Sequence, residues 1–192
     1  MPKSLLKVQF SFAEEHLTHF AGIVLIHRFC GKLGVKRLFQ RRIRFHPPRT
    51  RYAVADLLMA MLYTLIMGIG RFTNSHILKY NGAFQALVGL RSFPDPTTLQ
   101  RRLRNVPPKV IRQIVAIHDH LREKLWTKLM AGRTSLVWDL DSTVLTVYGN
   151  LEGARVGYNP TKPGRRSYHP LICTEAHSKT IWHGSFRPGN LY

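Results

Sequence analysis

Two carboxylates stand two residues apart in an apolar, β-branched stretch that reads W-D-L-D-S-T-V-L from Trp138 to Leu145. Side chains alternate across a β-strand, so Asp139 and Asp141 are expected to project from one face while Leu140 projects from the other. Two like charges this close repel each other unless a proton or a divalent cation neutralises them. The spacing therefore predicts a candidate metal site on an extended segment.

The same pair has a simpler interpretation, because structural ion pairs also cluster acidic residues. In that interpretation Asp139 or Asp141 pairs with an arginine or caps a turn. Beyond them the chain has only two more acids, Glu152 and Glu175. Glu175 stands near the end of a later predicted strand and remains open as a further metal ligand.

The charge of the chain indicates a polyanionic partner. It has 29 Lys and Arg against 10 Asp and Glu, a formal charge of +19, with a pI near 10.8. Residues 1–134 contain 23 basic and 6 acidic residues, so this region alone carries +17. Such an excess favours binding to nucleic acid or to an anionic surface.

Cysteine content and hydropathy favour a cytoplasmic protein. Cys30 and Cys173 are the only cysteines and form no paired spacing, which argues against a disulfide framework and a zinc module. The N-terminus lacks the apolar core of a signal peptide. The apolar stretch 53–70 contains Asp56 and ends in glycines, so a buried core helix is favoured over a membrane span.

Residues 1–132 read as a basic helical region. Helical spacing is expected from Phe12 to Phe29 and again from Leu33 to Phe39. Pro107 and Pro108 open a long helix, with an apolar stripe at Val110, Ile111, Ile114, Val115, His118, Leu121, Leu125 and Leu129.

The segment S-F-P-D-P-T-T-L-Q-R-R-L-R-N predicts a further helix from Pro96 to about Asn105, with Asp95 as its N-cap. Three arginines of this helix are candidates for contacts with DNA phosphates. The alternative is a solvated basic face. The three are Arg101, Arg102 and Arg104.

Strand signals replace helix signals near Gly132. Residues 135–139 and 144–148 are expected as strands, and Y-H-P-L-I-C-T-E-A and T-I-W-H-G-S-F as two more, joined by a turn at 177–179. They are interpreted as an antiparallel run. The predicted fold class is α+β, with a helical, DNA-binding region at 1–132 and a strand-rich domain at 133–192.

A glycine-rich loop from Gly153 to Tyr168 interleaves cations with aromatic residues, a combination that can hold phosphates and stack unpaired bases. The alternative is an ordinary surface loop whose arginines only add solubility. The candidate contacts are Arg155, Tyr158, Lys162, Arg165 and Arg166.

The stretch from D-L-D-S-T-V-L-T-V-Y-G-N through R-V-G-Y-N-P-T-K-P-G-R-R-S-Y-H-P-L closely resembles the DDE transposases of bacterial insertion sequences, specifically the thirteen-eighty family. The S-F-P-D-P-T-T-L-Q-R-R-L segment and the final F-R-P-G-N are also similar. The resemblance implies an RNase-H-like catalytic domain whose first strand bears the first acid of an Asp-Asp-Glu triad. By its position before Ser142 and Thr143, Asp141 resembles that acid more closely than Asp139.

The resemblance implies transposition of DNA by metal-dependent strand cleavage and transfer at insertion-sequence ends, with Mg²⁺ or Mn²⁺ held by acidic oxygens. The family pattern also requires a second Asp and a final Glu, for which the residues after Asp141 offer no match. The chain is therefore expected to be a truncated transposase, with only the first three strands of the RNase-H-like domain. We expect it to bind metal weakly and to be inactive alone.

Two other functions remain open. One is a non-catalytic DNA-binding protein that represses transposition, by self-association or by association with the full-length transposase. The other is an RNA-associated basic protein, although no RRM, KH or cold-shock signature is present.

Overall fold

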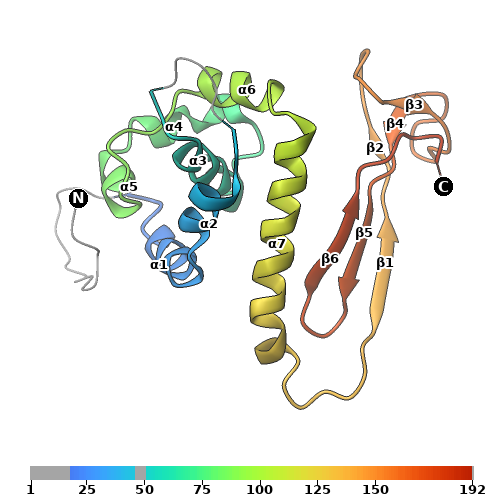
Figure 1. Cartoon of the computed structure of the whole chain (residues 1–192). Coiled ribbons are helices and arrows are strands. Elements are labelled where there is room, and N and C mark those ends of the chain that lie inside the picture. Colours follow the sequence, from blue (N-terminus) through green and yellow to red (C-terminus); the bar gives the residue numbers. More distant parts are fainter. Residues whose placement is uncertain (1–17, 46–50, 192) are drawn as a thin grey trace. The chain divides into compact units, whose positions relative to one another are not determined.

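In the computed structural model, residues 18–45 and 51–191 are described (Figure 1). The chain forms two compact units, residues 1–118 and 119–192, and the long helix α7 (Pro108–Leu129) runs through both. Helices make up the first unit and two small antiparallel sheets dominate the second. The α+β class expected from the sequence is confirmed at this level.

The helices of the first unit pack around an aromatic centre. The Phe84 ring lies edge-on to three others, with centroid distances of 5.8 Å to Phe20, 6.4 Å to Tyr63 and 5.9 Å to Phe93. Edge-to-face packing of this kind is the favoured aromatic geometry. Besides α7, the helical elements are α1 (Ile23–Leu33), α2 (Val35–Arg42), α3 (Val54–Ile66), the 3₁₀ turn η1 (Phe72–Ser75), α4 (His76–Lys79), α5 (Gly82–Leu87) and α6 (Pro96–Arg104).

The apolar stretch 53–70 forms α3, whose Leu57, Ala60 and Tyr63 are buried in the core. The prediction of a core helix is confirmed. None of the helices within residues 18–45 and 51–191 has the length and apolar character needed to cross a bilayer. The first predicted helix is shorter than expected, because α1 begins only at Ile23, after a turn; residues 12–17 lie outside the described part.

Helix α6 begins at Pro96 as predicted. The Asp95 side chain accepts a hydrogen bond from the Thr97 backbone N–H at 3.0 Å, and this caps the helix. Lys79 Nζ lies 2.9 Å from the second Asp95 oxygen and ties α4 to this end of α6. The capping hydrogen bond and the ion pair together fix where α6 starts.

Helix α7 begins at Pro108 as expected, but its predicted apolar stripe is wrong in part. Ile111 and Val115 are more than half exposed, whereas Val110 and Ile117 are buried. The spacing of apolar residues indicates a helix, but the elements that pack against the helix determine which of those residues are buried.

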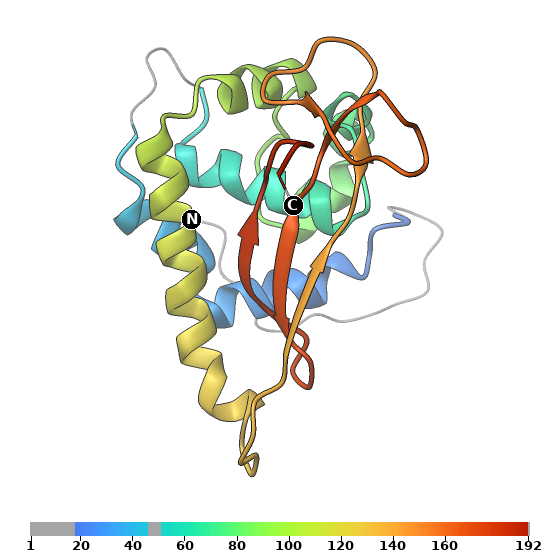
Figure 2. The ribbon, with the colours of Figure 1, turned by 90° about the vertical axis from the view of Figure 1, so that its right-hand side faces the viewer.

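The larger sheet has the strand order β1 (Trp138–Ser142), β5 (Leu171–Glu175) and β6 (Thr180–Ser185), all antiparallel (Figure 2). Three of the four strands expected from the sequence form this antiparallel sheet, whereas the one expected at 144–148 does not join it. The first strand begins at Trp138, three residues later than predicted at 135.

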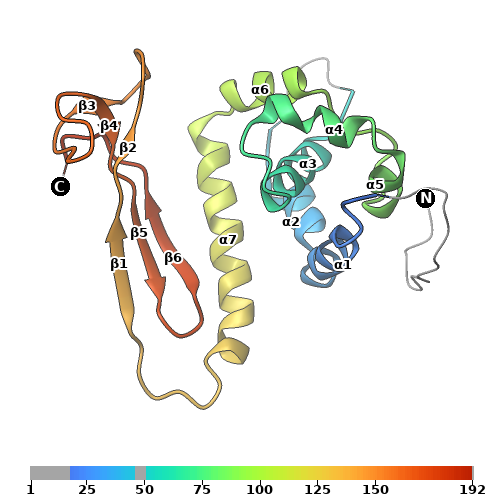
Figure 3. The same ribbon diagram turned by 180° about the vertical axis from the view of Figure 1, so that it is seen from behind.

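A second sheet was not predicted. It joins β2 (Leu145–Thr146), β4 (Arg166–Tyr168) and β3 (Arg155–Val156) in that order (Figure 3). Two of these strands have only two residues each and lie in the stretch expected to be a strand followed by a loop. Strands this short give no alternating pattern that could be detected.

Candidate functional site

Asp139 and Asp141 lie on β1 with their side chains on one face of the larger sheet. In the antiparallel register Asp139 is opposite Thr174 and Asp141 is opposite Ile172, both on β5. Residues two apart on a strand have Cα atoms about 6.8 Å apart. Both aspartates are exposed, so this face offers two carboxylates to solvent.

Within residues 18–45 and 51–191, no side-chain hydrogen bond or ion pair involves Asp139 or Asp141. The structure therefore contains neither of the simpler arrangements, a pairing with arginine or a turn cap. Carboxylate oxygens left to solvent are the ligands that divalent magnesium prefers.

On the opposite side of the larger sheet, α7 packs against Trp182 of β6. Trp182 of β6 contacts Trp138 of β1, with ring centroids 4.7 Å apart, and Trp126 of α7, at 4.9 Å. Because neighbouring residues alternate across a strand, the cluster that holds Trp138 leaves Asp139 and Asp141 on the other side.

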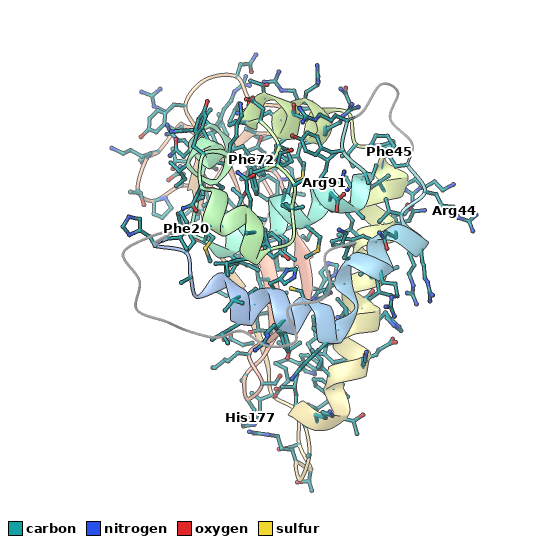
Figure 4. The ribbon with its side chains drawn as sticks, turned by 90° about the vertical axis from the view of Figure 1, so that its left-hand side faces the viewer. Phe20, Arg44, Phe45, Phe72, Arg91 and His177 are labelled. Atoms are coloured by element: carbon teal, nitrogen blue, oxygen red, sulfur yellow. The ribbon has the colours of Figure 1, made fainter. Side chains whose placement is uncertain are left out.

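Glu175 does not join the two aspartates. It pairs with Trp138 in the register of β1 and β5, so its side chain shares the face of Trp138 and not that of the aspartates. It is fully buried. Its carboxylate accepts hydrogen bonds from the backbone N–H groups of Ser178 at 2.7 Å and His177 at 3.3 Å; Figure 4 labels His177 at this turn between β5 and β6. Burial would raise the pKa of Glu175, but these hydrogen bonds outweigh it and lower the pKa to about 2.

Within the described residues, no group of three or more His, Cys, Asp or Glu side chains is arranged to hold a metal ion. The two carboxylates of β1 are therefore a pair and not a complete metal-binding cluster. They fit part of a magnesium site, because Mg²⁺ keeps several waters and needs few protein carboxylates.

The arginines of α6 differ in exposure. Arg101 and Arg104 are exposed and, being three residues apart, share one face of the helix. Arg102 is half-buried, toward the side on which Leu99 is fully buried. Two of the three predicted phosphate contacts are therefore presented to solvent together.

The five candidate residues of the glycine-rich loop all lie in or beside the smaller sheet, and all are exposed. They do not project from a single face. Arg155 pairs with Ser167 of β4, so these two side chains share one face. Arg166, which precedes Ser167 in β4, lies on the other face. The five are Arg155, Tyr158, Lys162, Arg165 and Arg166.

Two of these arginines also hold the loop in place. The Arg165 guanidinium lies 5.9 Å from the centroid of the Tyr148 ring, and Arg166 Nη1 donates to Asn150 Oδ1. Both contacts reach back to the segment that follows β2. The interleaving of cations and aromatic residues therefore has a structural role as well as a candidate binding role.

Asn159 and His169 build this region, and the sequence did not single them out. Asn159 is buried, donates to Thr146 Oγ1 at 2.8 Å and accepts from the Lys162 backbone N–H at 2.9 Å. His169 is buried, and its Nε2 lies 2.7 Å from the Tyr158 carbonyl oxygen. The partners Thr146 and Tyr158 lie 13 and 11 residues away along the chain, so these contacts have no local sequence signal.

A profile of the family described as Transposase DDE domain group 1 matches residues 2–192. The chain belongs to this DDE transposase family. No curated protein and no solved structure shows a significant match to the chain.

DDE transposases generally use divalent metal ions and act on DNA. In this transposase the carboxylates of β1 are exposed and make no side-chain hydrogen bond or ion pair with the described residues. The exposed arginines of α6 and of the smaller sheet are suited to phosphates.

Proposed function

We propose that this transposase acts in DNA transposition of a bacterial insertion sequence of the thirteen-eighty family, with Asp141 as a metal ligand on the first strand of an RNase-H-like domain. The observation that carries the proposal is the pair Asp139 and Asp141, exposed and unpaired on one face of β1. The antiparallel order β1, β5, β6 is consistent with the first three strands of such a domain.

Asp141 is the principal ligand in this proposal and Asp139 the auxiliary one. Both offer an exposed carboxylate on the same face, so geometry alone permits either. The preference for Asp141 comes from its position before Ser142 and Thr143 in the stretch that resembles the family. When bound, Mg²⁺ or Mn²⁺ would activate the attacking water or 3′-hydroxyl and stabilise the leaving oxygen.

The basic residues have a separate role, which is to hold the DNA. Phosphate contacts position a duplex without reading its sequence. We assign this role to the α6 arginines and to the loop of the smaller sheet, where the exposed Tyr158 also provides an aromatic surface for an unpaired base. The residues are Arg101, Arg102, Arg104, Arg155, Tyr158, Lys162, Arg165 and Arg166.

The 192 residues are proposed to bind metal weakly and not to cleave DNA by themselves. Two carboxylates supply less charge and less defined geometry than an acidic triad, and Glu175 is engaged on the opposite face. Affinity for a divalent ion is expected at about 1 mM or weaker.

Metal binding is tested by titrating Mn²⁺ into the chain and following the loss of the free-ion EPR signal. Asp141→Asn should abolish binding and Asp139→Asn should weaken it, while Glu123→Gln, at an exposed acid of α7, should leave it unchanged. Equal binding by Asp141→Asn and the unaltered chain would reject Asp141 as a ligand.

Cleavage is tested by incubating the chain with supercoiled plasmid and about 10 mM Mg²⁺, roughly ten times a dissociation constant of about 1 mM for the ion. No nicked or linear product is expected above a no-protein control. Robust nicking that Asp141→Ala removes would show that the chain is an active nuclease and would overturn the proposed inactivity.

A second candidate function is repression of transposition by a non-catalytic DNA-binding protein. The observation that favours it is the excess of charge in residues 1–134, which holds 23 basic and 6 acidic residues. Salt-dependent binding to insertion-sequence ends without metal, together with co-purification with a full-length transposase, would support it. Preferential binding to structured RNA would instead favour an RNA-associated role.

A further inference from the structure

Helix α2 presents a cationic face that sequence analysis did not single out. Val35 is buried, and Leu38 and Phe39 on the same side are half-buried. The opposite side carries four exposed polar residues, which successive 100° steps place next to one another around the helix. They are Lys36, Gln40, Arg37 and Arg41.

Within the described residues, Lys36 is the one cation of this face that pairs with a carboxylate. Residues 18–45 contain seven Lys and Arg and no acidic residue. Lys36 Nζ lies 2.6 Å from Asp56 Oδ1 at the start of α3. Within the described part of the chain, no carboxylate pairs with Arg37 or Arg41, which stand one helical turn apart.

The backbone around α2 is fixed at both ends. Gly34 ends α1 in the left-handed conformation, with φ of 73°, and α2 begins at the next residue. Beyond α2, the Arg44 backbone N–H donates to Gln113 Oε1 at 3.1 Å. Figure 4 shows the Arg44 side chain extending outward from this end of the unit. A rigid, cationic helix face loses little conformational entropy on binding.

We infer that the outward face of α2 is a second DNA-contact surface, with duplex DNA as its partner. The inference rests on the proposed function, which supplies DNA as the polyanion, and it extends that function to residues outside α6 and the loop. Arg37 and Arg41 suit phosphate oxygens or guanine edges, and Gln40 beside them suits an adenine edge. Lys32 and Arg44 are exposed on neighbouring turns and add phosphate contacts.

The test measures binding of the full chain to a fluorescein-labelled 30-base-pair duplex by anisotropy over a range of salt concentrations. The double variant R37Q/R41Q should bind about tenfold more weakly. The slope of log binding constant against log salt concentration should decrease in magnitude by about 1.8, since each lost phosphate contact removes about 0.9. The matched control is K109Q/R112Q, which removes the same charge from an exposed face of α7. The control should change affinity less than twofold.

The outcomes separate this inference from the proposed function. If wild type binds the duplex but both double variants behave alike, the α2 surface is rejected and the DNA-binding function stands. If wild type binds no duplex, both are rejected. If an RNA hairpin of equal length competes better than unlabelled duplex, duplex DNA is the wrong partner.

A crosslinking measurement covers the case in which R37Q/R41Q fails to fold, which circular dichroism would reveal. Benzoylphenylalanine introduced in place of Gln40 should crosslink to the duplex on irradiation. The same group in place of Ala116, an exposed position of α7, should not. Absence of a crosslink from position 40 under conditions where the chain binds the duplex would overturn the inference.

Discussion

The Arg122 guanidinium of α7 lies 4.1 Å from the centroid of the Trp182 ring of β6, and its Nη1 donates to the Trp182 carbonyl oxygen at 2.8 Å. Arg122 Nη2 also lies 3.1 Å from Asp119 on the same helix. A single side chain thus joins stacking, a backbone hydrogen bond and an ion pair. These contacts fasten α7 to the face of the sheet opposite the carboxylates.

We expect Arg122→Ala to destabilise the second unit by about 2 kcal/mol, since it removes a largely desolvated cation–π contact and a charged hydrogen bond. The chain's three tryptophans, Trp126, Trp138 and Trp182, all lie in this cluster. Their fluorescence during urea unfolding therefore reports on this unit.

Two control variants sharpen this measurement. Arg122→Lys keeps the charge but loses the planar fork, so an intermediate loss is expected. Lys128→Ala removes an exposed cation from the same helix and should change the free energy of unfolding by less than about 0.5 kcal/mol. Equal stability of Arg122→Ala and Lys128→Ala would contradict the role assigned to Arg122.

Glu175 makes stability depend on acid pH. Its pKa is about 2 in the folded chain against an ordinary value of 4.5, because the backbone donors of the turn outweigh the effect of burial. A lowered carboxyl pKa stabilises the fold fully above the unfolded value, and the contribution is lost as pH falls from 4.5 toward 2. Glu175→Gln should therefore be less stable than wild type at pH 7 and should approach it near pH 2.

This prediction is checked by urea unfolding followed by tryptophan fluorescence at several pH values between 2 and 7. The quantity compared is the difference in unfolding free energy between wild type and Glu175→Gln, because the other carboxylates titrate in both proteins and cancel. A difference in unfolding free energy that stays constant over this range would show that the turn does not depend on the ionised form of Glu175.

Local signals made part of this fold predictable. The start of α6 followed from Asp95 and Pro96, because an N-cap and a proline at the first helical position act within one turn. The shared face of Asp139 and Asp141 followed from strand alternation alone. In both cases the determining contacts lie within a few residues along the chain.

Features that depend on distant pairing were not predictable. The smaller sheet exists because Ser167 pairs with Thr146 on one side and Arg155 on the other. The position of Glu175 on the face opposite the aspartates depends on its register with Trp138. The period of α7 was visible, but the burial of Ile117 in place of Ile111 depends on which neighbours the helix meets.

The smaller sheet also depends on a close backbone approach at Gly189. A Cβ added there would lie 2.6 Å from the carbonyl oxygens of Arg155 and Ser167, which are backbone atoms of β3 and β4 and cannot move aside. Gly189→Ala should therefore push the C-terminal segment off this sheet and cost about 1 to 3 kcal/mol. Gly184→Ala in β6 is the matched control, because no described atom outside its chain neighbours lies within 4 Å of a Cβ built there.

Hydrogen exchange of individual backbone amides detects whether Gly189→Ala loosens the smaller sheet. The Val147 N–H donates to the Arg166 carbonyl oxygen at 2.9 Å and the His169 N–H donates to that of Arg187 at 2.8 Å, so both amides should exchange faster in Gly189→Ala. Gly184→Ala should leave their protection unchanged. Because the loop arginines are presented by the same sheet, Gly189→Ala should also weaken duplex binding, even though no cation is removed. Unchanged exchange in Gly189→Ala would show that the segment around Gly189 does not hold the sheet together.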